Sequence, residues 1–297
     1  MTRVNGFDAP PHPLQVCTWV LFPLILFGFY AILVPVLPIE LQNAVLPIYS
    51  FFAAATFFSA WITSAIDPRD TRALETEWAR DDKPVPAPSW TRCDCFAIKN
   101  AELAPETHQC YLCQAQVCTS SKHCRFCDKC VLRFDHHCKW LNTCVGRKNY
   151  RYFLAVIVCT WVFTTLHLAI SIYAIAELYR GSDSSVQRRS REHWLTRASA
   201  SRHVHEAAII LWGAAVAPFA ALIGQLAVFH AMLVRKDMTT YEYILAESRR
   251  DESGAKDATA CCFDASEIDF DARRCTCAPK ARVEGGVELS ERLPAES

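Results

Sequence analysis

Four long apolar stretches dominate the hydropathy pattern of the chain. They cover residues 16–37, 44–66, 152–178 and 207–234. An α-helix rises 1.5 Å per residue, so about 20 apolar residues cross a hydrocarbon core of about 30 Å. A soluble helical hairpin is the alternative for the first two stretches, but a soluble core does not need two successive runs of this length. The pattern therefore predicts an all-α polytopic membrane protein with four transmembrane helices, both chain ends lying on one side.

Polar segments separate and flank these helices. We expect a short cytosolic leader over residues 1–15, helices 1 and 2 within 16–66, and a linker over 67–109 with one short amphipathic helix. Helices 3 and 4 lie within 152–234, and the tail over 235–297 is expected to be largely disordered after residue 248. The leader lacks the basic region and small-residue cleavage site of a removable signal.

Residues 110–151, between helices 2 and 3, are rich in cysteine and histidine. The pairs Cys110/Cys113 and Cys124/Cys127 are CxxC motifs, whose two thiolates can reach one soft cation. Zinc in a tetrahedral site is the typical ion. Further candidate ligands bring the number to eight, enough for two closed sites: His123, Cys130, His137 and Cys144. A disulfide framework is the alternative, but such frameworks belong to small secreted domains.

Two four-ligand sites leave some cysteine and histidine residues of this module unused, namely Cys118, His136 and Cys138. Residues two apart share a face of an extended segment, so His136 and Cys138 would lie together while His137 points toward a metal. A thiol beside an imidazole can react as the thiolate, and Asp135 could orient that imidazole. Contact between Asp135 and His136 needs a turn that spacing does not establish, and Cys138 could instead be a spare zinc ligand.

The distribution of charged residues predicts the orientation of the chain in the membrane only in part. The formal net charge is zero, which argues against a nucleic-acid partner. The positive-inside rule places the module in the cytosol, since these residues flank the helices on its side: Arg69, Arg72, Arg147, Lys148, Arg151, Arg235 and Lys236. The loop over residues 179–206 carries six arginines and opposes this topology. A reducing cytosol suits zinc thiolates and a free Cys138, so the chemistry of the module decides the orientation.

The module resembles the cysteine-rich domain of the DHHC-type protein S-acyltransferases (palmitoyltransferases). The matching motifs are HCxxCxxC at residues 123–130, DHHC at 135–138, Trp140, NxCVGxxNxxxF at 142–153, and TTxE at 239–242 after the last helix. Arg69 replaces the glycine of the family's Asp-Pro-Gly motif, and Lys139 stands where most members have proline. The DHHC-Lys-Trp sequence, with PPHPLQ before the first helix, resembles one animal subgroup of the family.

The resemblance implies a role for each of these residues. One structural zinc ion would be held by Cys110, Cys113, His123 and Cys130, and a second by Cys124, Cys127, His137 and Cys144, in a module of short β-hairpins. Cys138 would be the nucleophile that accepts the acyl group, His136 its base, and Asp135 the partner of His136. Thr240 is expected to form a hydrogen bond near Asp135. Trp140, Lys139 and Thr240 are also the candidate contacts for the acyl donor.

We therefore expect a protein S-palmitoyltransferase in a lipid bilayer. It would transfer a long-chain acyl group from palmitoyl-CoA, or another acyl-CoA, through acyl-Cys138 to a cysteine of a membrane-proximal protein. By resemblance the acyl chain occupies an apolar slot between the helices, whose depth Phe163 could set. The rival hypothesis is a zinc-stabilised membrane adaptor with little or no catalysis. The subgroup resemblance implies the endoplasmic reticulum, with the Golgi or another endomembrane as alternatives.

Overall fold

The computed structural model describes residues 3–80, 107–180, 184–199 and 203–257. Residues 1–249 form one compact unit, and the second unit contributes only the last residues of one helix to the described part of the chain. The cysteines of the linker and of the tail lie outside the described residues, namely Cys93, Cys95, Cys261, Cys262, Cys275 and Cys277.

Four helices in the described residues are long and apolar enough to cross a membrane: Pro13–Val36, Ile39–Ala65, Tyr150–Tyr179 and Val204–Arg235. The first consists of α1 (Pro13–Phe27), a π-helical turn η1 (Gly28–Leu33) and a 3₁₀ turn η2 (Val34–Val36); the others are α2, α4 and α7. This confirms the predicted polytopic helical fold. Helix α1 begins three residues earlier than the apolar stretch because His12 caps it and Pro13 suits its first position.

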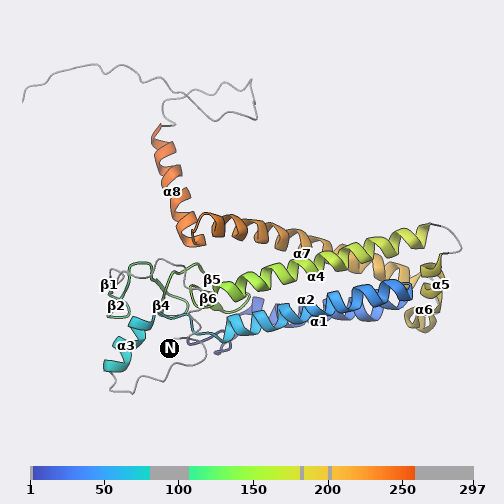
Figure 1. Cartoon of the computed structure of the whole chain (residues 1–297), viewed down its shortest axis with the longest axis horizontal. Helices are drawn as coiled ribbons and strands as arrows, with labels where there is room; N and C mark the ends of the chain where they lie inside the picture. Colours follow the sequence, from blue (N-terminus) through green and yellow to red (C-terminus); the bar gives the residue numbers. More distant parts are fainter. Residues whose placement is uncertain (1–2, 81–106, 181–183, 200–202, 258–297) are drawn as a thin grey trace, which may run out of the picture. The chain divides into compact units, whose positions relative to one another are not determined.

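Helix α4 packs against both α2 and α7 (Figure 1). The core between the helices contains Phe29, Tyr49 and Phe163. The rings of Phe29 and Tyr49 stack with centroids 3.5 Å apart, and Phe163 meets Tyr49 edge-on at 5.7 Å. Large apolar side chains also cover the outer faces of the helices, as a surface in contact with lipid requires, for example Phe51, Trp61, Ile172 and Leu211.

The connection between α4 and α7 is a packed structure that the sequence analysis treated only as a loop. It contains α5 (Ser185–Glu192) and α6 (Trp194–Ser199). His193 and His205 place their Nε2 atoms 2.9 Å from the Ala31 and Ile32 carbonyls of η1, and their rings stack with centroids 3.8 Å apart. Arg189 donates to the Leu37 carbonyl at 2.7 Å. One of the six unexpected arginines therefore satisfies a carbonyl just after the first span ends.

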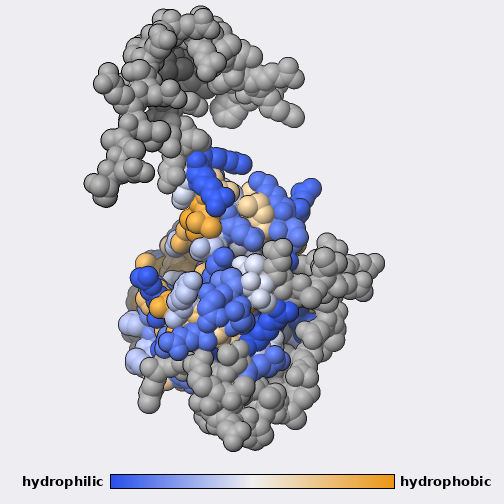
Figure 2. All heavy atoms as spheres, turned by 90° about the vertical axis from the view of Figure 1, so that its left-hand side faces the viewer, coloured by the Kyte–Doolittle hydropathy of each residue, from blue (hydrophilic) through white to orange (hydrophobic). Residues whose placement is uncertain are grey.

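The cysteine-rich module consists of three antiparallel hairpins at the end of the bundle where α4 begins (Figure 1). The strands are β1 (Thr107–Cys110) with β2 (Ala115–Cys118), β3 (Lys122–Cys124) with β4 (Lys129–Val131), and β5 (His136–Cys138) with β6 (Thr143–Val145). Figure 2 faces this end of the molecule and shows a mainly hydrophilic surface with scattered apolar side chains. The predicted short hairpins are confirmed.

The segment after α2 joins the module to the bundle. Arg69 forms an isolated bridge with Val131, and the Asp70 N–H donates to the Cys130 carbonyl at 2.9 Å. The Asp70 carboxylate is fully buried and accepts from the Cys118 N–H and the Ser121 hydroxyl. Helix α3 (Thr71–Arg80) follows and confirms the predicted linker helix. Helix α2 ends at Ala65, shortly before Pro68, and the residues next to this proline hold the module against the bundle.

The N-terminal segment also packs onto the module, although the sequence predicted only a polar leader. The Arg3 N–H donates to the Cys127 carbonyl at 3.0 Å, and the Gly6 N–H donates to the Ser64 carbonyl at 2.7 Å. The Asn142 side chain donates to the Gly6 carbonyl at 3.2 Å. A Cβ at residue 6 would collide with the Leu141 carbonyl, so the close approach requires glycine.

Helix α8 (Thr240–Asp257) starts after the last span and runs past residue 248, where disorder was expected. Its first turn is a capping box, because the Thr239 hydroxyl accepts from the Glu242 N–H at 3.2 Å while Glu242 Oε2 accepts from the Thr239 N–H at 2.8 Å. The first threonine and the glutamate of TTxE thus fix the start of this helix.

Replacement of Thr239 by alanine removes one of these two bonds. We expect a loss of about 1 kcal/mol in the stability of the first turn of α8, since an N-cap hydroxyl contributes about that much. Amide hydrogen exchange of residues 240–243 should accelerate, and Glu242→Gln, which keeps an acceptor oxygen, should change it less. Equal exchange in wild type and Thr239→Ala would contradict this account of the motif.

Protonation of His193 should destabilise the packed loop. Burial lowers the pKa of His193, although the Ala31 carbonyl acts in the opposite direction. Its contribution to stability is therefore complete above about pH 6.5, the pKa of an unfolded histidine, and is lost as the pH falls below it. We expect wild type to unfold at a lower temperature at about pH 5.5 than at about pH 7.5, and His193→Gln to show a smaller difference. Thermal unfolding in detergent measures the difference in unfolding temperature between the two pH values for each protein. An equal difference in wild type and His193→Gln would contradict a role for His193.

Candidate active site and metal centres

The first cluster of potential metal ligands contains Cys110, Cys113, His123 and Cys130. The His123 Nδ1 atom lies 3.1, 3.9 and 4.0 Å from the sulfurs of Cys113, Cys130 and Cys110. The other ring nitrogen, Nε2, lies 3.6 Å from a carboxylate oxygen of Asp128. Carboxylates often orient ligand histidines in this way.

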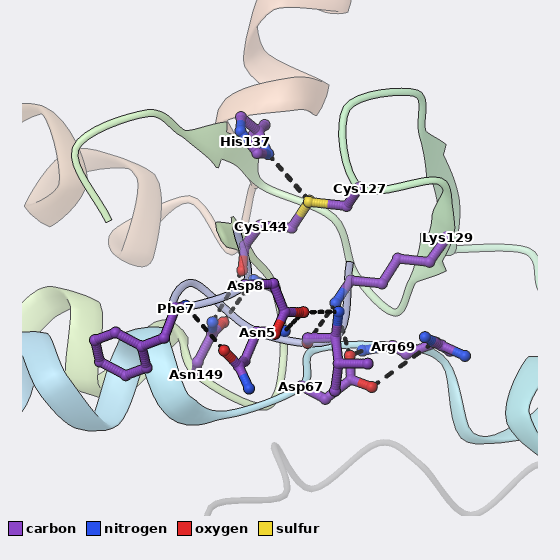
Figure 3. Close-up of polar contacts among 12 residues, drawn as sticks. Asn5, Phe7, Asp8, Asp67, Arg69, Cys127, Lys129, His137, Cys144 and Asn149 are labelled. Carbon is purple, nitrogen blue, oxygen red and sulfur yellow. Dashed lines mark hydrogen bonds and ion pairs between the residues drawn. The ribbon is translucent and has the colours of Figure 1, made fainter. Parts of the chain in front are cut away.

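The second cluster contains Cys124, Cys127, His137 and Cys144. Figure 3 shows His137, Cys127 and Cys144 pointing toward one another. The His137 Nδ1 atom lies 3.3, 3.6 and 3.9 Å from the sulfurs of Cys127, Cys144 and Cys124. The Phe126 ring covers His137 with centroids 5.1 Å apart.

Both clusters fit tetrahedral zinc. The ligand atoms within each lie no more than 4.8 Å from one another. Zinc–sulfur and zinc–nitrogen bonds of about 2.3 and 2.0 Å place tetrahedral ligand atoms about 3.5 to 3.8 Å apart, close to these distances. Three thiolates and one imidazole with no open position are typical of structural rather than catalytic zinc.

Strand alternation explains why the two ligand sets interleave in sequence. His123 pairs with Cys130 across the β3–β4 hairpin, so both reach the first cluster. The next residue, Cys124, points to the opposite face and reaches the second. There it meets His137 and Cys144, which are paired across β5–β6. The β3–β4 hairpin therefore contributes to both clusters and ties the other two hairpins together.

The same alternation separates the candidate catalytic residues from the metal. His136 and Cys138 lie on the face of β5 opposite His137, as the sequence predicted. The His136 Nδ1 atom lies 2.6 Å from Asp135 Oδ2, so the contact that spacing alone could not establish is present. The Asp135 N–H donates to the Val145 carbonyl and fixes the acidic residue at the edge of the hairpin.

Helix α8 supplies a further contact to Asp135. The backbone N–H of Thr240 donates to Asp135 Oδ1 at 2.8 Å, which is the hydrogen bond expected for this residue. Burial would raise the pKa of Asp135, but the bonds from His136 and from the Thr240 N–H lower it. Burial would likewise lower the pKa of His136, but Asp135 and the adjacent Cys138 thiol raise it to about 9. The site therefore stabilises the charged form of the His136 ring, on the face of β5 that also carries Cys138.

Apolar residues of the bundle surround the Cys138 side. Cys138 is buried and forms one cluster with Val145, Phe153 and Ile157. Residues from α7 complete the cluster, including Ile223, Leu226 and Ala227. The candidate nucleophile therefore lies where the module meets the apolar contact between α4 and α7. An acyl chain attached at this sulfur would find apolar side chains from both helices.

The residues predicted to contact the acyl donor, Trp140, Lys139 and Thr240, lie in different surroundings. Trp140 is 46% exposed and follows β5 directly, and Lys139 is exposed with its ammonium 6.0 Å from the Phe126 ring centroid. Thr240 meets Asp135 through its backbone, so a contact of this residue with the acyl donor stays a prediction. Phe163 is buried between Phe22 and Tyr49, ten residues beyond Phe153 on α4.

Sequence reasoning missed the residues that connect the module to its surroundings. Asn149 is fully buried and donates to the carbonyls of Thr63 on α2 and Cys144 on β6. Lys129 is buried and bonds Asp67. His230 on α7 bonds the Tyr150 hydroxyl and packs on Phe153. The position of Asn149 in the NxCVGxxN motif could have indicated its importance, whereas no pattern in the neighbouring sequence distinguished Lys129.

Comparisons with known proteins agree with this geometry. A family model described as DHHC palmitoyltransferase matches residues 104–247. Human palmitoyltransferase ZDHHC1 is 34% identical over 256 residues, which are 82% of this chain and 50% of the human protein. Mouse ZDHHC11 is 30% identical over 257 residues, which are 82% of this chain and 71% of the mouse protein.

More distant relatives include protein S-acyltransferase 18 of Arabidopsis thaliana, 28% identical over 296 residues that cover 82% of this chain and 57% of the plant protein. The chain spans about half the length of the human and mouse ZDHHC1 proteins that it matches, 50% and 51%. The resemblance found in the motifs is confirmed, because the residues that the family model matches include the module, α4, α7 and the TTxE sequence. The chain belongs to the DHHC palmitoyltransferase family.

Proposed function

We propose that the protein is a protein S-acyltransferase that carries its acyl group on Cys138. One observation supports this most strongly: the His136 ring bonds the Asp135 carboxylate and shares a face of β5 with the Cys138 thiol, which packs among apolar residues of α4 and α7. The acyl chain would lie between these two helices, in an apolar groove. An adaptor would need the zinc clusters but not a spare thiol beside a charged imidazole. No contact in the described residues favours that alternative.

The first half-reaction transfers the acyl group to the enzyme. The Cys138 thiolate attacks the thioester carbonyl of acyl-CoA, and the carbon–sulfur bond to coenzyme A breaks. The proton from Cys138 resides on His136 and then passes to the departing sulfur, giving acyl-Cys138 and free coenzyme A. Asp135 holds the Nδ1 side of His136, so the other ring nitrogen is the one available for this transfer.

The second half-reaction releases the acyl group to a protein. A cysteine thiol of a membrane-proximal substrate gives its proton to His136 and attacks the acyl-Cys138 carbonyl. The carbon–sulfur bond to Cys138 breaks, and the departing Cys138 sulfur takes the proton from His136. The product gains about 0.8 kcal/mol of membrane affinity for each CH₂ group that it buries. A long chain therefore anchors a protein that already contacts the membrane.

Two zinc ions are proposed as structural parts of the enzyme. The eight ligands would hold them in closed sites, and zinc would supply cross-links between the three hairpins. The catalytic groups of the chain act on the opposite face of β5. His137 would link the zinc site to the catalytic groups, because a bond from its ring to the metal would fix the strand between His136 and Cys138.

Palmitoyl-CoA is the proposed donor. Phe163 lies ten residues beyond Phe153, about 15 Å along the axis of α4, and packs against Phe22 of α1 and Tyr49 of α2, outside the cluster around Cys138. A role for Phe163 in setting the depth of the acyl site stays a prediction from the resemblance. Trp140 would stand at the groove entrance, and the exposed ammonium of Lys139 is available to a phosphate of coenzyme A. The module would face the cytosol, and the endoplasmic reticulum is the proposed membrane on the strength of the subgroup resemblance.

Acyl-enzyme formation tests the proposed function. Purified protein in detergent is incubated with labelled palmitoyl-CoA, and wild type is compared with Cys138→Ser. We expect a hydroxylamine-sensitive label on wild type and its loss in the variant, because the thioester forms at this sulfur. Cys159→Ser, which replaces a cysteine of α4 outside the site, is the matched control and should keep the label.

Two results would sink the proposal. One is the absence of label on folded, zinc-loaded wild type. The other is a label of unchanged intensity on Cys138→Ser, which would place the acyl group on another cysteine. Either outcome favours the adaptor hypothesis, whose prediction is that the module binds zinc and partners without forming an acyl-enzyme.

A further inference from the structure

We propose that Lys129 and Asp67 are positioning residues of the transfer reaction: an ion pair with a buried ammonium that clamps the second metal cluster to the membrane exit of α2 and to the N-terminal segment. This inference rests on the proposed function for its kinetic consequence. Its structural part is independent of activity, because the clamp holds together three parts of the chain that are far apart in sequence.

The Lys129 ammonium is almost completely enclosed, with a side-chain exposure of 1%. It donates to Asp67 Oδ1 at 2.7 Å and to the Val4 carbonyl at 2.8 Å. Figure 3 shows this side chain reaching from its strand toward Asp67. A buried ammonium is tolerated only with such partners, so the module must keep this position relative to the other two segments.

Each partner is itself held in place. Asp67 follows α2 and also accepts from the Arg69 N–H at 3.1 Å. Val4 and Asn5 donate their backbone N–H groups to Asp8 Oδ2, which shapes the N-terminal segment into a closed turn. The lysine therefore joins the end of a membrane helix to a preformed loop.

Two routes lead from the clamp to the nucleophile. Lys129 pairs with Cys124 across the β3–β4 hairpin, and Cys124 shares the second cluster with His137, the neighbour of both His136 and Cys138. The second route needs no metal. The N-terminal segment accepts from the Asn142 amide at Gly6 and at Pro10, and Asn142 lies in the turn that connects β5 to β6. Both routes fix β5 relative to the groove between α4 and α7.

Positioning, rather than chemistry, is the role that this geometry permits. The Lys129 ammonium has no exposed surface with which to meet a substrate, and its bonds all go to structural groups. A shift of about 1 Å in the reacting atoms can lower a rate about 100-fold, so a loosened module would slow acyl transfer without altering the acyl-binding groove.

The test compares Lys129→Met, Asp67→Asn and their combination with wild type, all as full chains in detergent. We expect each single variant to retain both zinc ions and to form acyl-enzyme about tenfold more slowly at saturating palmitoyl-CoA. The palmitoyl-CoA concentration for half-maximal rate should change by about twofold at most, since the groove is intact. The double variant should be slowed by less than the product of the two single effects, because both changes remove the same ion pair.

Arg125→Met is the matched control. Arg125 is a cation of the turn that connects β3 to the strand of Lys129, but its side chain is exposed. It should keep the wild-type rate. Amide hydrogen exchange supplies the readout that does not depend on activity: residues 3–7 should exchange faster in Lys129→Met and Asp67→Asn than in wild type or Arg125→Met, with the zinc content unchanged.

The outcomes separate this proposal from the proposed function. If wild type forms no acyl-enzyme but exchange at residues 3–7 still responds to Lys129→Met, the clamp stands and the transferase assignment fails. The positioning proposal is overturned if Lys129→Met and Asp67→Asn keep wild-type rates and exchange. It is also overturned if both variants lose zinc, since the pair would then serve folding of the module alone.

Discussion

The side-chain alternation of one short strand, β5, is the constraint on which the rest of the site depends. His137 points into a cluster of three cysteines, whereas His136 and Cys138 point to the opposite side, toward the membrane helices. Adjacent residues of an extended chain cannot do otherwise. A metal bond to His137 would therefore fix the direction in which the thiol and imidazole face, and the DHHC sequence would combine a structural ligand with reactive groups on one three-residue element.

The surrounding structure supplies what this strand cannot provide alone. Asp135 is held by the start of α8, whose capping box leaves the Thr240 N–H available to the carboxylate. Asn149 ties β6 to α2, and α4 begins immediately after it. The buried polar contacts between module and bundle are individually modest, but each would leave an unsatisfied group if it were broken. Their combined effect is to give the thiol one position at the entrance to the groove.

Much of this arrangement was predictable from sequence. Charge-free runs predicted the four spans, and the CxxC pairs with nearby histidines predicted the metal ligands, because both signals depend on local composition and spacing. The pairing of the ligands into two sets could not be derived that way, since it depends on which hairpin strands lie opposite each other, as His123 and Cys130 do. The packing of the N-terminal segment was also missed, because its contacts are backbone carbonyls and a glycine that carry no distinctive pattern.

The central claim is that the metal bond of His137 positions Cys138 and His136. Its most direct test measures zinc content and the rate of acyl-enzyme formation in His137→Ala and His137→Cys. A cysteine can replace the imidazole as a zinc ligand, so the account predicts that His137→Cys keeps the metal and a large part of the rate. His137→Ala should lose the second zinc ion and acyl-enzyme formation together. Full acylation of His137→Ala, with that zinc absent, would contradict the account.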